Sequence, residues 1–156
     1  YKKTLKMPKK KKGYLNEDDI RKGTLKGLKK YKKLKFLERF AMYMGIAQLL
    51  EIILKQILSE KFSYPLDKTE RWTLGHVVSE LKKNKLREDI FLFLDSIVED
   101  RNYIAHDLLA NHILINTILN SKKSIYSKEI RRLKRAIYEL EQVYFIIDWT
   151  NQHKGW

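Results

Sequence analysis

Apolar residues recur at three- and four-residue steps along the chain, and this repeat limits the fold more than any other feature. The first series is Phe36, Phe40, Tyr43, Ala47, Leu50, Leu54 and Ile57. A later series is Ile130, Leu133, Ile137, Leu140, Tyr144 and Ile147. Such spacing places apolar side chains on one face of an α-helix. No segment shows the sustained alternation of a strand, so we expect an all-α fold.

Capping residues predict where the earlier helices begin. Asn16 is followed by three acidic residues, which suits an N-cap and the first turn of a helix. This short helix, weakened by Gly23 and Gly27, should run to about residue 30. Thr73 should cap a second short helix over residues 74–83, and an asparagine after it helps to end that helix.

The second half of the chain predicts two more long helices. One should begin near residue 87 and continue to about residue 119, with room for a kink. A polar break is expected over residues 121–124, and Ser127 is the expected cap of the last helix. Together the segments predict a bundle of four or five helices that is antiparallel where the loops are short.

Composition predicts one domain with a nucleic-acid partner. We expect residues 1–15, rich in lysine, to form a flexible basic arm that is either solvated or in contact with phosphates, and residues 16–156 to form a single domain. The formal net charge of +14 attracts polyanions, of which nucleic acid is the commonest. A lysine-rich surface can also serve solubility alone. No cysteine and no obvious ligand cluster is present, so we expect no metal and no cofactor.

The chain is expected to be cytoplasmic and not to span a membrane. It has no cysteine, and its first sixteen residues lack the apolar centre of a secretory signal. The most apolar segment, residues 40–58, is interrupted by Gln48, Glu51, Lys55 and Gln56, which favours a buried core helix. A weaker alternative is attachment of residues 1–12 to an anionic membrane surface.

An arginine interrupts the apolar stripe of the third long helix. The stripe consists of Ile90, Leu94, Ile97, Ile104 and Leu108. Arg101 lies in the middle of it. An unpaired guanidinium in an apolar seam is costly, so we expect Arg101 to meet an acidic partner, water or a ligand.

The hexapeptide that contains this arginine, RNYIAH (101–106), has the residue types of a phosphodiester site. Asn102 and His106 are one turn apart and share a helix face, so the amide could orient the imidazole. Arg101 is roughly 140° from His106 at ~100° per residue. The two side chains can meet if the helix bends, or if a two-fold axis brings a second copy beside this face.

The Arg-Asn-x-x-x-His element (101–106), late in a long helix of a small all-α bundle, resembles that of the HEPN superfamily. The similarity extends to the TLG-x-V-x-x-x-L segment (73–81), and residues 30–150 are compatible with this fold. The resemblance implies a HEPN-like bundle and a homodimer whose paired Arg and His residues form a metal-independent endoribonuclease site. Members act as toxins, in phage defence and in RNA processing, which implies an antitoxin or regulatory protein as a further partner.

The resemblance also implies a role for each residue of the motif. Arg101 would hold the scissile phosphate and stabilise its developing charge. His106 would act as general base or acid, and Asn102 would position the site. The expected reaction is transesterification to a 2′,3′-cyclic phosphate. Many toxin members carry a tyrosine two residues after the histidine, where this chain has Leu108, so modification at that position is not implied.

Alternatives remain for each of these assignments. RWTLGH (71–76) repeats the Arg–His spacing, but it straddles an expected helix cap and has Trp72 in place of the polar second residue. Arg101 could instead form a structural ion pair with Glu99 or Asp100. The whole domain could be a non-catalytic HEPN-like module that binds RNA, a nucleotide or a protein.

Two further sets of polar residues could support the site. Glu51, in a narrow polar strip of the first long helix, either reaches Arg101 or faces solvent. Arg131, Arg132 and Arg135 form a basic patch on the last helix that either follows an RNA backbone or is simply solvated.

Overall fold

The structure is a computed structural model that describes residues 15–112 and 123–156. All regular secondary structure in these ranges is helical, which confirms the all-α prediction. The expected arm (1–15) lies outside the described residues except for Leu15. The same is true of the end of the third long helix beyond residue 112 and of the start of the polar break at residues 121 and 122.

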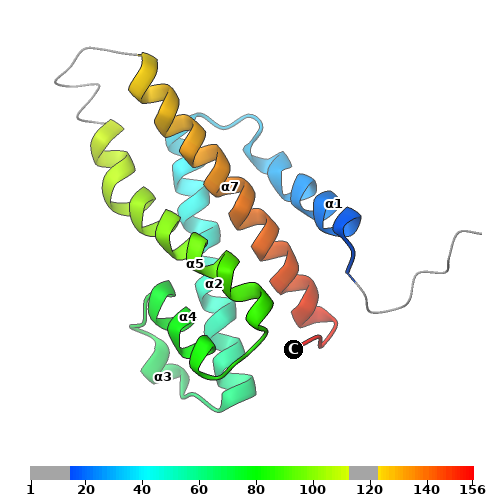
Figure 1. Cartoon of the computed structure of the whole chain (residues 1–156). Coiled ribbons are helices and arrows are strands. Elements are labelled where there is room, and N and C mark those ends of the chain that lie inside the picture. The colour runs from blue at the N-terminus through cyan, green and yellow to red at the C-terminus, as the bar shows by residue number, and fades with distance from the viewer. Residues whose placement is uncertain (1–14, 113–122) are drawn as a thin grey trace, which may run out of the picture.

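The described ranges contain six α-helices, where four or five were expected; the short α3 was not anticipated. They are α1 (Glu17–Leu28), α2 (Phe36–Phe62), α3 (Leu66–Thr69), α4 (Leu74–Lys83), α5 (Glu88–Tyr103) and α7 (Lys123–Gln152). In Figure 1, α2 and α7 run in one direction and α5 runs in the other. Helix α1 lies along α7, and α3 and α4 lie at the lower end of the view.

The predicted caps at the start of α1 and α4 are confirmed. The Oδ1 atom of Asn16 accepts a hydrogen bond of 2.8 Å from the backbone N–H of Asp19. The Oγ1 atom of Thr73 accepts one of 3.4 Å from the N–H of His76, and α4 has the predicted bounds. The cap predicted at Ser127 is wrong, because α7 already begins at Lys123 and Ser127 lies one turn inside it.

The core lies where α2, α4, α5 and α7 meet. The apolar series predicted from the sequence supplies it: Tyr43, Ala47, Leu50, Leu54 and Ile57 of α2 and Leu133, Ile137, Leu140 and Ile147 of α7 are buried. The stripe of α5 and its continuation is buried as well, at Ile90, Leu94, Ile97, Ile104 and Leu108. Burial of these faces supplies the main stabilisation of the fold.

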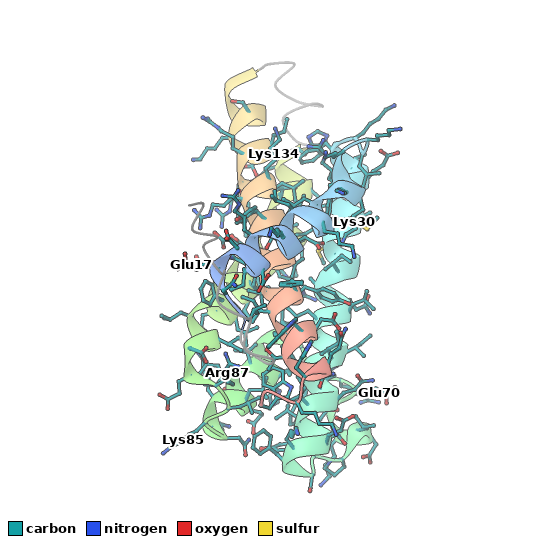
Figure 2. All side chains as sticks on the ribbon, turned by 90° about the vertical axis from the view of Figure 1, so that its right-hand side faces the viewer. Glu17, Lys30, Glu70, Lys85, Arg87 and Lys134 are labelled. Carbon is teal, nitrogen blue, oxygen red and sulfur yellow. The ribbon has the colours of Figure 1, made fainter. Side chains whose placement is uncertain are left out.

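Two glycines of α1 allow it to lie close to α7 (Figure 2). A Cβ atom at Gly23 would overlap the ring of Phe145, and one at Gly27 would overlap the carboxylate of Glu141. Glu141 is buried; it accepts a hydrogen bond of 2.8 Å from the Tyr31 hydroxyl and forms an ion pair of 2.6 Å with Lys30 Nζ. The residues that weaken α1 as an isolated helix are therefore the ones that let it pack.

Helix α2 buries only one of its faces. Leu37, Leu49 and Ile52 on its other side are exposed, and a Cβ atom at Gly45 would meet nothing within 4 Å. By length and composition α2 could cross a membrane: its most apolar 18-residue window has a mean hydropathy of 1.4, and 39% of that window is buried in the bundle. The expectation of a buried core helix therefore holds for one side of α2.

Candidate functional site

Arg101 and His106 lie on either side of a change in helix type. Arg101 is in the last turn of α5, and His106 is in the π-helical turn Ile104–Leu108 (η2) that continues it. A π turn closes an i→i+5 hydrogen bond in place of i→i+4, so each residue rotates less about the axis. This reduces the angle between the two side chains from about 140° to roughly 100°. The kink expected in this helix is therefore a π turn, a feature that often occurs at functional sites.

The guanidinium of Arg101 has no carboxylate partner among the described residues. The side chain is half-buried, and its Nη1 donates a hydrogen bond of 3.3 Å to the Oδ1 atom of Asn102. Burial is the main cause that raises the pKa of the Tyr43 hydroxyl, and the positive charge of Arg101 partly opposes this rise. In this structure Arg101 therefore does not form the structural ion pair with Glu99 or Asp100 that was its alternative role.

His106 is exposed, and no described residue forms a hydrogen bond or ion pair with its imidazole. Asn102 is also exposed, but its amide accepts from Arg101 and does not bond to His106. Asn102 therefore does not orient the imidazole as expected; its side chain bonds to Arg101 instead. Among the described residues, no hydrogen bond joins Arg101 to His106 within one chain.

The charged side chain that points inward in this turn is Asp100. It is 6% exposed, and its Oδ2 atom has no hydrogen-bond partner among the described residues. Its Oδ1 atom lies 3.8 Å from Nη2 of Arg132 on α7. Burial is the main cause that raises the pKa of this carboxyl. The hydroxyl of Tyr43, fully buried, lacks a partner too, so two polar atoms are unsatisfied where α2, α5 and α7 meet.

Sequence reasoning did not identify Asp100 as a site residue. Adjacent residues differ by about 100° around a helix, so Asp100 lies toward one edge of the stripe whose middle Arg101 occupies. Only the position of α7 decides which of the two is covered. The available signal was the position of the acid at the edge of the stripe, and Arg101, in the middle of the stripe, gave the stronger signal.

The three arginines of the basic patch line a cavity of about 460 Å³ between α5 and α7. The lining consists of Ser96, Glu99, Asp100, Arg131, Arg132 and Arg135. The structure therefore brings the predicted RNA-binding arginines together, but Arg101, Asn102 and His106 do not line this cavity. In Figure 1 these parts of α5 and α7 lie in the upper half of the bundle.

Each arginine of the cavity has a different environment. The guanidinium of Arg132 lies over the ring of Tyr103, with Cζ 3.4 Å from the ring centroid. Arg135 Nε donates a 2.9 Å hydrogen bond to Glu139, which also accepts one of 2.8 Å from Ser96 Oγ. Arg131 donates to the backbone carbonyl of Ser127 at 3.3 Å and pairs with no carboxylate of the described residues.

Glu51 does not reach Arg101 in this structure. Its Oε1 atom accepts a hydrogen bond of 2.8 Å from Nζ of Lys55, one turn further along α2. Lys55 also donates to the backbone carbonyl of Glu70 at 3.1 Å. The half-buried Glu51 thus supports the junction of α2 with the turn after α3.

Another cavity, of about 530 Å³, lies at the opposite end of α5 and α7 and is lined largely by apolar residues. Arg87 lines this cavity, and its guanidinium donates hydrogen bonds to both carboxylate oxygens of Asp89 and to the carbonyl of Gly155. Figure 2 places Arg87 toward the lower end of the bundle and Lys134, in the basic patch, toward the upper end. The two cavities therefore lie toward opposite ends of α5 and α7.

No three histidine or acidic residues of the described ranges are arranged to hold a metal ion. No family model matches the chain, and no curated protein or solved structure matches it. Functional assignment therefore depends on the chemistry of the residues described above.

Proposed function

We propose that this chain is a metal-independent endoribonuclease of the cytoplasm that acts as a homodimer. The observation that carries the proposal is the half-buried Arg101, which no carboxylate of the described residues neutralises although Glu99 and Asp100 are its neighbours in sequence. An arginine that is held near the surface without an acidic partner is suited to bind an external anion. His106, exposed and without a hydrogen-bond or ion-pair partner among the described residues, lies in the π turn that follows and supplies an imidazole that can accept or donate a proton.

The proposed reaction needs only these side chains and the RNA itself. One imidazole of the His106 pair removes the proton of a 2′-hydroxyl, whose oxygen then attacks the adjacent phosphorus. The bond from phosphorus to the 5′ oxygen breaks, and the imidazolium formed in the first step returns its proton to that oxygen. Arg101 binds the phosphate oxygens on which negative charge develops. The products are a 2′,3′-cyclic phosphate and a 5′-hydroxyl end.

A dimer is part of the proposal because one chain holds Arg101 and His106 apart. A two-fold axis beside this face would supply two arginines and two imidazoles to one phosphodiester. The exposed side of α2 offers apolar surface on the same body of the molecule, at Leu37, Leu49 and Ile52. The similarity of residues 101–106 to the HEPN motif adds support and favours a toxin or phage-defence effector.

The test compares substitutions at two motifs with the same spacing. Arg101→Ala and His106→Ala should abolish the formation of cyclic-phosphate ends on total RNA, in the presence of EDTA, while circular dichroism and size-exclusion profiles remain those of the parent. His76→Ala is the matched control, because His76 is also exposed and follows an arginine by five residues. Parental cleavage by either Arg101→Ala or His106→Ala refutes the proposal.

A second candidate function is RNA binding without cleavage. The cavity of Arg131, Arg132 and Arg135 favours it, because this cavity lies apart from His106 and requires no catalysis. A binding module of this kind would show RNA affinity that falls steeply with salt and no cyclic-phosphate product after long incubation.

A further inference from the structure

The cavity of about 530 Å³ that Arg87 lines has an apolar wall that the fold leaves open. It lies between the start of α1, the start of α5 and the end of α7, and Ile20, Phe93 and Ile146 line it, one from each helix. Phe93 is 46% exposed, so the bundle does not cover its ring. Water is held poorly against an apolar wall, and an apolar group that displaces it gains free energy. The wall therefore favours an apolar occupant.

The charges in the lining neutralise each other. Nε and Nη2 of Arg87 donate hydrogen bonds of 3.0 Å and 2.7 Å to the two carboxylate oxygens of Asp89, and Nη1 donates one of 3.3 Å to the carbonyl of Gly155. Arg87 has a φ of 43°, which is uncommon for a residue with a side chain, and the three bonds hold its guanidinium in one position. Among the described residues no other charged side chain lines the cavity. An ion would lose its hydration here without gaining an unpaired partner, so the lining favours an uncharged molecule.

Two polar groups of the lining remain available to an occupant. Gln142 and Trp149 are half-buried, and no described residue forms a hydrogen bond with the amide of Gln142 or with the indole N–H of Trp149. Both groups are accessible, because the buried polar atoms that lack a partner in the described part of the chain belong to Tyr43 and Asp100. An amide can donate and accept at once, so Gln142 suits a single hydroxyl or carbonyl group.

We propose that this cavity binds an uncharged, mainly apolar small molecule that carries one hydroxyl or carbonyl group. The apolar body packs against Ile20, Phe93 and Ile146, and the polar group bonds to the amide of Gln142. A volume of about 530 Å³ falls within the range of small-molecule sites, which is about 300–1,000 Å³, and such sites combine an apolar lining with a few polar groups. The proposal goes beyond the proposed function, because an uncharged ligand is unlike RNA and the residues of the RNYIAH motif do not line this cavity.

Straight-chain alcohols are suitable probes, because they vary the apolar length and keep the same polar group. Pentanol, hexanol, heptanol and octanol are titrated separately into the full chain, and the indole N–H signals are followed by ¹H–¹⁵N NMR. The signal of Trp149 should shift, while that of Trp72, which does not line the cavity, should stay in place. Each CH₂ group that the cavity buries should tighten binding about fourfold. Octanol should bind at least tenfold more tightly than octanoate, whose carboxylate is ionised at neutral pH.

Two pairs of variants assign the binding to this cavity. Phe93 and Leu92 are exposed neighbours on α5, but only Phe93 lines the cavity. Phe93→Ala should weaken octanol binding about tenfold, and Leu92→Ala should leave it unchanged. Gln142→Ala should weaken it about threefold to tenfold through loss of one hydrogen bond, and Gln48→Ala, on the exposed side of α2, is its control. Thermal melting by circular dichroism checks that all four variants are folded.

The outcomes separate this inference from the proposed function. The site is overturned by any of three results: a Trp149 signal that does not move up to the solubility limit of octanol, octanoate binding as tight as that of octanol, or equal affinities in Phe93→Ala and Leu92→Ala. Cleavage that depends on His106 would survive each of these results. Binding of octanol would in turn survive a failure to cleave RNA, so the two failures are distinguishable.

Discussion

Replacement of Gly23 by alanine should destabilise the fold, whereas the same replacement at Gly45 should stabilise it. Both glycines lie inside α-helices, in α1 and α2 respectively. A Cβ atom at Gly23 would overlap three ring atoms of Phe145 on α7, and one at Gly45 would meet nothing within 4 Å. The pair therefore isolates helix packing from helix propensity.

The expected magnitudes follow from these surroundings. Alanine in place of glycine inside a helix stabilises it by roughly 0.5–1 kcal/mol, and Gly45→Ala should gain this in full. Overpacking at a close contact costs about 1–3 kcal/mol, so Gly23→Ala should lose a net ~0.5–2 kcal/mol of unfolding free energy. The two variants should thus differ by about 1–3 kcal/mol. At roughly 2–4 °C per kcal/mol for a chain of this size, that is a gap of about 2–12 °C.

Thermal and urea unfolding followed by circular dichroism measure this difference directly. Equal slopes against urea for the two variants and the parent would show that all three unfold in the same way. If Gly23→Ala melts at or above Gly45→Ala, then α1 does not pack against α7 as described, and the explanation for its two glycines fails.

Three more outcomes are expected. Burial raises the pKa of Asp100 above its usual 3.8, so the parent loses stability relative to Asp100→Asn as pH rises through that raised pKa. The unfolding free energy of Asp100→Asn, measured with urea, should exceed that of the parent by little at low pH and by about 1 kcal/mol at neutral pH. A difference that does not change with pH would contradict this. Tyr31→Phe removes the buried hydrogen bond to Glu141 and should lower the unfolding free energy, measured with urea, by about 1.5–3 kcal/mol. A decrease smaller than the measurement error would refute that bond. Arg131→Gln should reduce the slope of log affinity for single-stranded RNA against log salt by roughly 0.7 in filter binding, and an unchanged slope would remove Arg131 from the RNA contact.

The elements that the sequence predicts best are those with a local signal at both ends. Helix α4 has its predicted bounds because Thr73 caps it and Asn84 follows its last turn. The start of α7 was misplaced because serines at 121, 124 and 127 are similar candidates for a cap. The importance of Gly23 was also hidden, because its value depends on Phe145, a residue more than a hundred positions away.

For the candidate site, the sequence predicts which residue types are present better than it predicts their contacts. The anomaly at Arg101 was visible in the apolar stripe, but the inward position of Asp100 depends on where α7 lies. The π turn at Ile104–Leu108 has no strong residue signature, so it could be expected only as a bend. For Glu51 the sequence left open whether it reaches Arg101 or faces solvent, and its pairing with Lys55 is a local i,i+4 contact that the sequence also allows.

Subunit complementation tests the shared RNA-cleaving site most directly. Arg101→Ala and His106→Ala proteins are each inactive under the proposal, and a mixture of equal amounts, allowed to exchange subunits, places an intact arginine from one chain opposite an intact histidine from the other. We predict that the mixture regains formation of 2′,3′-cyclic phosphate ends on single-stranded RNA in EDTA. A mixture that stays inactive beside an active parent, or a parent that forms no cyclic-phosphate ends, would contradict it.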